Sequence, residues 1–465
     1  MVEITKNNRR VLNKAIVIGF GRVGQFISQF LVHNGITVLG YDDDQTVFQQ
    51  KRLANIINNP NFKILNKSQL GNKELNADFA IISPGVSARS NIIKYLNENN
   101  IPIYDEIDFT QEVINHRCQN NQRQPILIAI TGTNGKSTAT SLLGRMLSLA
   151  GKDIFWGGNL APGLPYSVAL FQNPKNYYVL EVSSFQLRRI EKFHPQIAIL
   201  LNITADHLDQ HASLSEYQNT KFRIFRNQST NDYTIINADD KTIMSKIHQL
   251  ANSQKILFSK LVKTNGAYIK DNIICYRNEN IVRLDRINLL GSQYYDSILA
   301  AVTCAKILKV KNSIIANVLQ NFSGIEHRLE FVGEISGVKY INNSMCTNPT
   351  AGIATLDAFS QPVILITGGK EKNLDIIPYI RSIIAKAKIA ILFGENRHRL
   401  ASLLKKENYH NYRLANSLKQ AVKISHQLAL PNDIVLFSPA FASFDLFQNF
   451  QERGNAFKEY VYELT

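Results

Sequence analysis

The sequence has few cysteines and no long apolar run. Its 465 residues include four cysteines, which are far apart and form no C-x-x-C pair: Cys118, Cys275, Cys304 and Cys346. This spacing supports neither a disulfide framework nor a cysteine-rich zinc site, so we expect reduced, structural thiols. No apolar stretch is as long as a membrane span, and no signal-peptide core follows the start MVEITKNNRR. We therefore expect a cytoplasmic protein with no membrane partner.

Acidic residues are scarce relative to basic ones. The chain has 37 Asp and Glu against 52 Lys and Arg, which gives a net charge of +15. The basic residues are spread along the chain without a dense block or a DNA- or RNA-binding motif, so we expect no nucleic-acid partner. The charge favours anionic substrates, and a general bias towards lysine and asparagine explains it equally well. With 45% hydrophobic and 19% charged residues, the chain is expected to be globular.

What the chain does contain is a phosphate-binding loop. Residues 126–147, ILIAITGTNGKSTATSLLGRML, read as a buried strand, a glycine turn and a helix. The glycines let backbone N–H groups converge on an anion, Lys136 adds a point charge, and Ser137 or Thr138 can reach a magnesium ion. Ile130 occupies the place of the first glycine in G-x-x-x-x-G-K-[ST], so this is a variant P-loop. It predicts binding of ATP or GTP.

A second glycine-rich turn lies near the start of the chain. KAIVIGFGRVG, residues 14–24, reads as a buried strand that runs into G-x-G-x-x-G, and the next strand, ITVLGYDDD, places Asp42 near a ribose hydroxyl. By itself this pattern leaves an NAD-dependent oxidoreductase open. Further along, ADFAIISPGVS reads as a strand that ends at Ser83, Pro84 and Gly85. The carboxyl edge of a parallel sheet is where such residues would bind a ligand.

Two further strands end in polar side chains. YYVLE, residues 177–181, ends in a glutamate, and the strand IAILL, residues 197–201, is followed by Asn202, Thr204, Asp206, His207 and Asp209. If both strands neighbour the P-loop strand, these groups gather around the phosphates and any Mg²⁺. A third run of alternating strands and helices begins near FSGIEHRLE. We therefore expect three α/β domains with doubly wound or mixed sheets.

Five segments in order, TGTNGKST, EVSSFQL, NITADHLD, EHRLE and SPAFASFDLF, resemble the Mur ligases of peptidoglycan synthesis. The resemblance covers nearly the whole chain and is strongest to the ligases that add glutamate to UDP-N-acetylmuramoyl-L-alanine. It implies a Rossmann-like UDP-substrate domain (1–112), a central P-loop ATPase domain (113–322) and a Rossmann-like glutamate-binding domain (323–465). It also implies a monomeric cytoplasmic enzyme that uses ATP and Mg²⁺ to join D-glutamate to its substrate through an acyl phosphate.

The resemblance also implies roles for individual residues. The nucleotide would be held by Gly132, Thr133, Asn134, Gly135, Lys136, Ser137, Thr138, Arg328 and Asn343. The metal would be bound by Ser137, Glu181, His207 and Lys221, the lysine as a carbamate because an ammonium has no acceptor. The catalytic residues would be Lys136, Glu181, His207, Lys221 and Arg328. The UDP-sugar and glutamate would contact Arg22, Val23, Ser83, Gly85, Asn159, Ser183, His207, Thr347, Lys372, Ser443, Phe444 and Phe450.

The chain departs from this family on the side of the nucleotide's base and ribose. Where these ligases usually read N-D-S-K-x-T-N, residues 342–348 place Asn343 in the acidic position and Met345 in the lysine position. Where they read G-x-H-N-x-x-N, residues 291–297 are GSQYYDS and lack both asparagines. In the N-terminal domain, Asp43 and Asp44 stand where a hydroxyl and a cation are common. We expect weakened or rearranged ATP binding, with an inactive relative or a ligase for L-glutamate as the alternatives.

Overall fold

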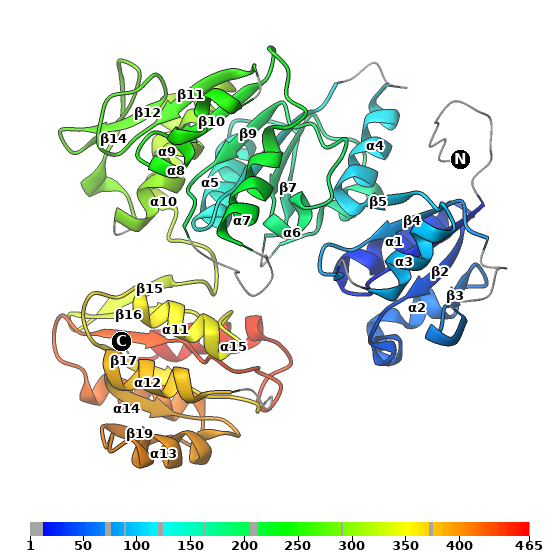
Figure 1. Cartoon of the computed structure of the whole chain (residues 1–465). Helices are drawn as coiled ribbons and strands as arrows, with labels where there is room; N and C mark the ends of the chain where they lie inside the picture. The colour runs from blue at the N-terminus through cyan, green and yellow to red at the C-terminus, as the bar shows by residue number, and fades with distance from the viewer. Residues whose placement is uncertain are drawn as a thin grey trace. The chain divides into compact units, whose positions relative to one another are not determined.

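The computed structural model describes residues 13–69, 76–87, 90–119, 124–160, 163–204, 213–250, 252–289, 292–371 and 375–464, with the backbone alone for Gln249 and Gln293. Figure 1 labels the helices and strands along the chain. Among these residues, no helix has both the length and the apolar character needed to span a bilayer.

The first sheet is five-stranded and parallel, in the order β3-β2-β1-β4-β5. Its strands are β1 (Lys14–Ile18), β2 (Thr37–Tyr41), β3 (Phe62–Ile64), β4 (Phe79–Ile82) and β5 (Ile103–Asp105), and its helices are α1 (Arg22–His33), α2 (Ala54–Ile57), α3 (Asn91–Glu98) and α4 (Glu106–Gln119). Successive strand residues face opposite sides, so Val17 packs in the core of α1 and α4 while Ile16 packs in that of α3. The carboxyl ends of β1 and β4 are neighbours, which is the switch point where such sheets bind ligands.

The second sheet contains the P-loop strand at its centre, in the parallel order β11-β10-β9-β6-β8-β7. The strands are β6 (Ile126–Thr131), β7 (Ile154–Gly158), β8 (Tyr177–Glu181), β9 (Ile197–Leu200), β10 (Tyr233–Asn237) and β11 (Gln254–Phe258). The helices are α5 (Lys136–Leu149), α6 (Ser184–Leu187), α7 (Leu214–Phe222), α8 (Lys241–Ser245), α9 (Tyr295–Ile307) and α10 (Asn312–Asn321). A small antiparallel sheet of β12 (Ala267–Lys270), β13 (Ile273–Tyr276) and β14 (Glu279–Arg283) follows.

The third large sheet has the order β15-β16-β20-β17-β18-β19 and is parallel except for β15. Its strands are β15 (Glu330–Ile335), β16 (Val338–Asn342), β17 (Val363–Thr367), β18 (Ala387–Leu392), β19 (Tyr412–Leu414) and β20 (Ile434–Phe437). One face packs on α11 (Pro349–Asp357), α12 (Ile377–Lys386) and α13 (Arg397–Lys406), and the other on α14 (Leu418–Leu428) and α15 (Phe450–Tyr462).

Short 3-10 helices complete the described secondary structure: η1 (Gln45–Gln49), η2 (Lys51–Leu53), η3 (Lys67–Gln69), η4 (Tyr166–Phe171), η5 (Arg223–Phe225), η6 (Ile247–Gln249), η7 (Leu284–Arg286) and η8 (Ser292–Tyr294). Of these, η4 packs on α1 and α4. The ring of Phe30 on α1 lies 6.3 Å from that of Phe109 on α4 and 6.2 Å from that of Phe171 on η4. The first two sheets therefore share one apolar core.

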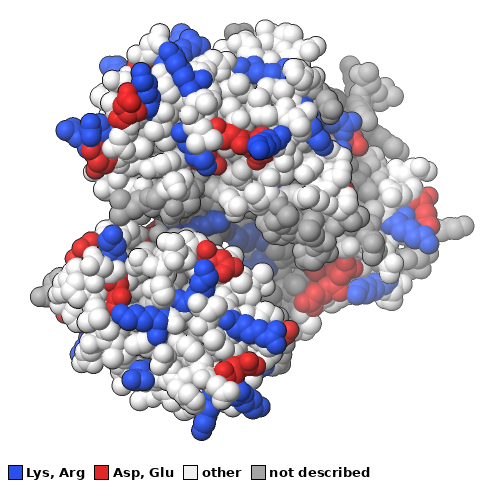
Figure 2. All heavy atoms as spheres, turned by 60° about the vertical axis from the view of Figure 1, so that its left-hand side comes forward, with Lys and Arg blue, Asp and Glu red and all other residues white. Residues whose placement is uncertain are grey.

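The chain divides into two compact units, Met1–Phe322 and Ser323–Thr465. The expected α/β fold of mostly parallel sheets is confirmed, and the expected strands at GFGRVG, SPGVS and the P-loop are β1, β4 and β6. The predicted domain boundary after residue 112 lies inside α4. This division of the first unit stays a prediction. On the face shown in Figure 2, Lys and Arg side chains are scattered among uncharged residues.

Candidate active site

The phosphate-binding loop connects β6 to α5, as the sequence predicts. Gly132 and Gly135 have φ values of 155° and 81°, in the left-handed region that favours glycine. The Nζ of Lys136 donates to the carbonyl oxygens of Gly132 at 3.0 Å and Thr133 at 2.8 Å. The ammonium is therefore held at the loop, where the N-terminus of α5 also favours an anion.

The segment that follows β9 holds the loop in place. The N–H of Thr133 donates to the carbonyl oxygen of Asn202 at 3.0 Å, and the N–H of Asn134 donates to its side-chain oxygen at 2.8 Å. The N–H of Thr204 donates to the Thr133 hydroxyl at 3.0 Å. Asn202 and Thr204 thus lie at the P-loop as expected, and they fix its backbone.

The other polar residues expected beside them, Asp206, His207 and Asp209, lie outside the described residues, as does Lys372. The proposed roles of His207 at the metal and of Lys372 at glutamate therefore have no geometry to support them.

Lys221 approaches the loop from α7. Its side chain is 1% exposed, and its Nζ donates to the carbonyl oxygen of Gly132 at 2.8 Å. The same nitrogen lies 4.6 Å from the centre of the Tyr217 ring, whose face attracts a cation. The side chain of Lys221 is thus buried and ends at the P-loop, and its predicted role at the metal stays a prediction.

Glu181 lies beside the P-loop because β6 and β8 are parallel neighbours and pair Ile130 with Glu181. The carboxylate is 2% exposed, and its Oε1 accepts a hydrogen bond from Asn159 Nδ2 at 2.9 Å. Its Oε2 is also buried, and no hydrogen-bond partner reaches it within the described part of the chain. An unpaired buried oxygen of this kind costs about 1–3 kcal/mol, more when it is charged, so it is suited to a ligand.

The residues at this place fit a magnesium ion. Mg²⁺ prefers carboxylate and hydroxyl oxygens, and Ser137 in the first turn of α5 is 3% exposed. No cluster of three or more His, Cys, Asp or Glu suited to a metal occurs in the part of the chain that the structure describes. The described protein ligands would therefore be few, which is usual for Mg²⁺ that bridges substrate phosphates.

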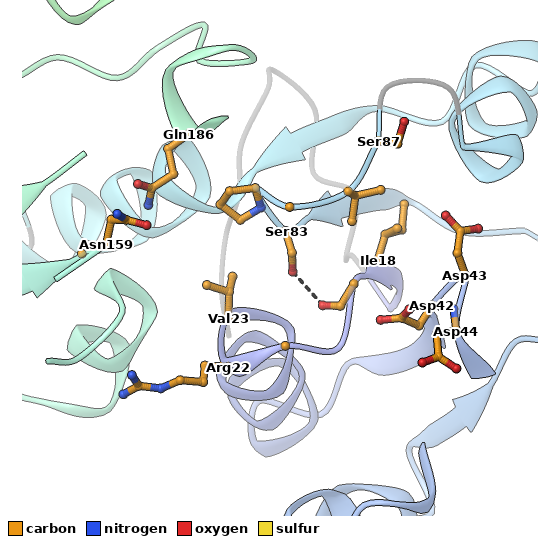
Figure 3. A pocket seen from close by; sticks show the side chains of 16 residues that line it. Ile18, Arg22, Val23, Asp42, Asp43, Asp44, Ser83, Ser87, Asn159 and Gln186 are labelled. Atoms are coloured by element: carbon orange, nitrogen blue, oxygen red, sulfur yellow. Dashed lines mark hydrogen bonds between the residues drawn. The ribbon is translucent and has the colours of Figure 1, made fainter. Parts of the chain in front are cut away.

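A pocket of about 680 Å³ lies at the switch point of the first sheet. It is lined from five places in the sequence: the turns after β1 and β2, the loop after β4, Gly158 and Asn159 at the end of β7, and Gln186 on α6. In Figure 3, Asn159 and Gln186 lie on one side of the view and the aspartates on the other, with Ser83 between them. The pocket contains five of the residues expected at the UDP-sugar, namely Arg22, Val23, Ser83, Gly85 and Asn159.

Two side chains shape this pocket from its edges. The Ser83 hydroxyl donates to the carbonyl oxygen of Gly19 at 2.7 Å, which ties the β4 loop to the glycine turn. Ser183 caps α6: its hydroxyl accepts from the N–H of Gln186, whose side-chain oxygen in turn accepts from the N–H of Ser183 at 3.0 Å. Ser183, expected at the substrate, is thus the residue that orients Gln186. Sequence reasoning had not singled out Gln186, although the S-x-x-Q capping pattern marks it.

The three aspartates of the pocket are bound to the protein itself. Asp42 accepts from the N–H of Phe20 at 2.7 Å and that of Asp44 at 2.9 Å. Asp43 accepts from the hydroxyls of Tyr41 at 2.9 Å and Ser90 at 3.2 Å. Burial, then the bond to Asp43, raises the pKa of Tyr41 to about 12. These carboxylates hold the glycine turn and the β2 loop, and Arg22 donates to the carbonyl oxygen of Gly163 at 2.6 Å.

In the second unit, the residues expected at glutamate collect at one edge of the sheet. β16 and β20 are parallel neighbours and pair Asn342 with Phe437, so segments 343–348 and 438–444 leave the same edge. Ser443 is 2% exposed and Phe444 is 64% exposed. Thr347 and Phe450 are half-buried, and Arg328 is exposed.

Asn343, in the acidic position, is buried and hydrogen-bonded at both ends. Its Nδ2 donates to the Thr355 hydroxyl at 2.8 Å and to the Ser438 hydroxyl at 3.4 Å. Its Oδ1 accepts from the N–H of Leu329 at 3.2 Å. The amide therefore anchors the turn that contains Arg328. Met345 also meets this turn, because its N–H donates to the carbonyl oxygen of His327 at 3.0 Å.

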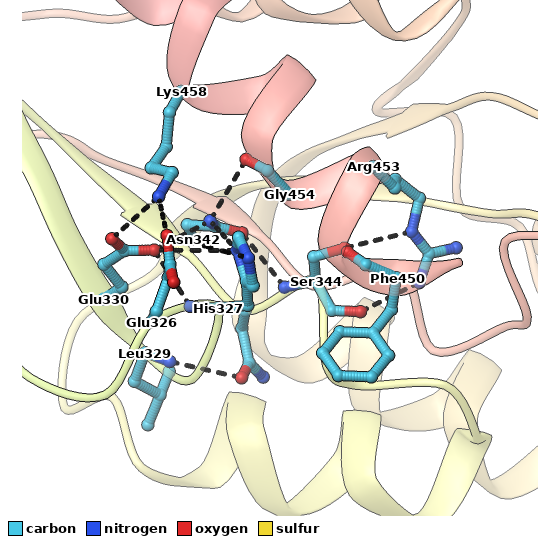
Figure 4. A network of polar contacts seen from close by, with 11 residues as sticks. Glu326, His327, Leu329, Glu330, Asn342, Ser344, Phe450, Arg453, Gly454 and Lys458 are labelled. Carbon is cyan, nitrogen blue, oxygen red and sulfur yellow. Dashed lines mark hydrogen bonds and ion pairs between the residues drawn. The ribbon is translucent and has the colours of Figure 1, made fainter. Parts of the chain in front are cut away.

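The polar network in Figure 4 surrounds the same turn. Lys458 bridges Glu326 at 2.6 Å and Glu330 at 3.3 Å. Glu330 Oε2 accepts from the N–H of His327 at 2.9 Å and from Asn342 Nδ2 at 3.0 Å. Burial lowers the pKa of His327, although both glutamates favour its charged form.

Arg453, a residue that sequence reasoning missed, holds the other side of this segment. It is fully buried on α15 and donates to the Ser344 hydroxyl at 3.1 Å, the Ser344 carbonyl at 2.9 Å and the Phe441 carbonyl at 3.0 Å. Burial lowers its pKa to about 10. Arg453 follows the quoted motif SPAFASFDLF by only a few residues, and the sequence contains no further signal for it.

Within residues 291–297, the side chains of Ser297 and Asp296 contact other segments of the chain. The Ser297 hydroxyl donates to the carbonyl oxygen of Gly135 at 3.0 Å, so α9 contacts the P-loop. Asp296 pairs with Lys260 at 3.2 Å, and burial raises its pKa. Gly291 and the side chain of Gln293 lie outside what the structure describes.

Comparison with known proteins agrees with this geometry. Residues 130–305 match the Mur ligase middle domain, and residues 327–441 match the Mur ligase, glutamate ligase domain. The chain is 36% identical over 458 residues to the UDP-N-acetylmuramoylalanine--D-glutamate ligase of Natranaerobius thermophilus, covering 97% of this chain and 98% of that protein.

Solved structures share the fold at low identity. UDP-N-acetylmuramate-alanine ligase MurC of Thermotoga maritima has a TM-score of 0.55 at 16% identity, covering 98% of this chain and 100% of the other. The MurF ligase of the same organism, in complex with ADP, has a TM-score of 0.53 at 14% identity, covering 84% and 90%. Full-length identity and both family domains lead to one conclusion: the chain belongs to the Mur ligase family and is an ATP-dependent ligase that forms amide bonds.

Proposed function

We propose that the protein adds D-glutamate to UDP-N-acetylmuramoyl-L-alanine in the cytoplasmic synthesis of peptidoglycan precursors. One observation carries the proposal: Asn159 lines the substrate pocket and also donates to Glu181 beside the P-loop. A substrate that fills the pocket would thus present one end to the residues that hold phosphates. The name of the Natranaerobius thermophilus relative supplies the substrates.

The chemistry follows from the poor reactivity of a carboxylate. Attack by an amine would have to expel an oxide, so the γ-phosphoryl group of ATP is first transferred to the alanyl carboxylate. Lys136 and the loop N–H groups offset the charge on the phosphates during this transfer. The amine of glutamate then attacks the acyl phosphate, and the tetrahedral intermediate releases phosphate and leaves the amide.

Mg²⁺, when bound, would neutralise phosphate charge, and Ser137 and Glu181 would hold it, together with His207. Lys221 would join them as a carbamate, which has the oxygen acceptors that an ammonium lacks. The remaining nucleotide, UDP-sugar and glutamate residues, including Arg328, keep the roles that the resemblance implies. We further propose a monomer with domain boundaries at 112/113 and 322/323.

The test is phosphate release by the purified protein with MgATP, UDP-N-acetylmuramoyl-L-alanine, and D- or L-glutamate in separate reactions, with the product mass measured. We expect phosphate release and a product heavier by one glutamate residue in the reaction with D-glutamate, and neither in the reaction with L-glutamate. The Lys136→Ala variant should keep its circular dichroism spectrum and lose turnover. Product with L-glutamate alone would instead assign the other enantiomer.

Asn343 and Met345 favour one further candidate, a relative that binds precursors without catalysis. An ATP titration separates the two, because a ligase must bind MgATP and a silent relative need not. No product with either enantiomer at saturating ATP would reject the proposed ligase.

A further inference from the structure

A second pocket, of about 570 Å³, lies in the same unit as the substrate pocket. Its apolar side comes from the first sheet and α3, with Ile82, Ile93, Ile101 and Ile103. Its polar side comes from α4, the segment after α6 and η5. None of the residues proposed for the reaction lines it.

The polar side has more basic than acidic groups. Arg188, Arg189, Lys192 and Arg223 line the pocket against two carboxylates, Asp108 and Glu191. Asp108 Oδ2 accepts from the backbone N–H groups of Glu191 and Lys192, and Lys192 is paired with Glu112 at 2.6 Å.

Two of the arginines contact main-chain carbonyl groups. Arg189 donates to the carbonyl oxygen of Val86 at 2.7 Å, and Arg223 donates to those of Leu187 and Ile190. Burial lowers the pKa of both guanidinium groups. Half-buried cations beside an apolar wall suit an oxyanion, which a guanidinium can bind through two parallel hydrogen bonds.

The two pockets have a common wall. Ile82 faces the second pocket and Ser83 the first, and Gln186 faces the first while Arg188 faces the second. Arg189 spans this wall, because it lines the second pocket and holds the carbonyl oxygen of Val86, a residue of the first.

We propose that the second pocket binds a small organic oxyanion, a phosphate or carboxylate on an apolar body, and that its occupation weakens binding in the substrate pocket. The anion competes with the Val86 carbonyl for Arg189, so the 83–87 segment loses this hydrogen bond to the loop after α6. The two sites are then coupled, and linkage requires that each ligand weaken the other by the same factor.

The first experiment measures binding by calorimetry with phenyl phosphate and benzoate, against inorganic phosphate and benzyl alcohol. Inorganic phosphate has the charge without the apolar body, and benzyl alcohol has the apolar body without the charge. We expect one or both aromatic anions to bind at least tenfold more tightly than either of these two compounds. The variant Asn97→Trp fills the pocket from an exposed position on α3, and Lys94→Trp alters an exposed position on the same helix that does not line it. Binding should fall at least tenfold in the first variant and stay unchanged in the second. The proposed site would be overturned if the aromatic anion bound equally well to both variants, or if inorganic phosphate were the one probe that bound.

The second experiment measures the affinity for UDP at rising concentrations of the better aromatic anion, and rests on the proposed function. We expect the UDP dissociation constant to rise several-fold and then level off, because the sites are distinct. A rise without limit would mean competition at one site, and no change would mean no coupling; either result overturns the coupling. Because the first experiment needs neither substrate nor turnover, failure of the proposed function would leave its result intact.

Discussion

The two oxygens of Glu181 have different surroundings. Oε1 is fixed by Asn159, and Oε2 is buried with no hydrogen-bond partner in the described part of the chain. At the scale of a single residue, an unpaired buried oxygen next to the P-loop strand is suited to a ligand.

Replacing Glu181 by glutamine should separate folding from function. The Glu181→Gln variant keeps a side-chain oxygen for Asn159 and removes a buried charge, so we expect thermal stability without ligand to hold or rise. Losing one charged ligand, worth ~1.5–3 kcal/mol, should lower turnover about tenfold to 100-fold and reduce the thermal shift produced by MgATP. The exposed Glu98→Gln variant is the control. A normal MgATP shift in E181Q would remove Glu181 from the metal site.

Aspartate at position 343 should destabilise the folded protein. The Thr355 hydroxyl that accepts from Asn343 Nδ2 already donates to the carbonyl oxygen of Ala351 at 2.7 Å. A carboxylate at position 343 would face this oxygen in a buried site, so we expect Asn343→Asp to lower the free energy of unfolding by about 1–3 kcal/mol. Urea denaturation measures it, with Asn408→Asp, at an exposed position, as the control. Unchanged stability would show that the hydroxyls reorient without penalty.

At the scale of the elements, local sequence signals were sufficient for several of the strands and for the two glycine turns. Apolar runs marked β1, β2, β4, β6, β8 and β9, and glycine spacing marked the turns after β1 and β6, whereas β15 and β19 of the third sheet were not predicted. These signals depend on neighbours in the chain, so they can be read without the fold.

The supporting contacts could not be predicted in this way. Arg453 meets Ser344 across 109 positions of sequence, and Asn343 finds Ser438 across 95. Whether an arginine on a helix is exposed or fully buried depends on the strand order, which no local pattern fixes. The same holds for the second pocket, whose walls come from distant segments.

The start of α4 contains buried acids, and one of them gives a pH dependence. Glu106 is fully buried, and burial, opposed by a hydrogen bond from the Ser167 N–H, raises its pKa from 4.5 to about 7. In the unfolded chain the group ionises near its ordinary pKa, so the stabilisation is complete below about 4.5 and is lost as pH rises towards 7. One pKa unit is ~1.36 kcal/mol, so the loss is on the order of 3 kcal/mol.

The Glu106→Gln variant isolates this effect. Its side chain still accepts from Ser167 and does not titrate. We expect the difference in unfolding free energy, wild type minus variant, to fall by on the order of 3 kcal/mol between about pH 4.5 and 7. Urea titrations across this range measure it. A difference that stays constant would mean that Glu106 is ionised in the folded protein throughout.

At the scale of the whole molecule, the chain forms two compact units, and its one tryptophan lies in the first. Trp156, on β7, therefore reports on residues 1–322, whereas far-ultraviolet circular dichroism reports on both units. This difference allows a change in the second unit to be recognised by itself.

The Arg453→Met variant should make use of this. It leaves three buried acceptors without a donor, which we expect to destabilise the second unit by roughly 3 kcal/mol or more. The circular dichroism transition in urea should begin at lower denaturant while the tryptophan transition moves little. Arg413→Met, at an exposed position of the same unit, is the matched control. If both transitions moved together, the two units would unfold as one.

The wall between the two pockets also bears on inhibitor resistance. Arg189 binds the main-chain carbonyl oxygen of Val86, which every residue type carries. A side-chain substitution at Val86 that excludes a drug from the substrate pocket would therefore leave this acceptor in place. A compound that binds the second pocket through Arg189 would accordingly be less affected by resistance at position 86 than a compound that fills the substrate pocket.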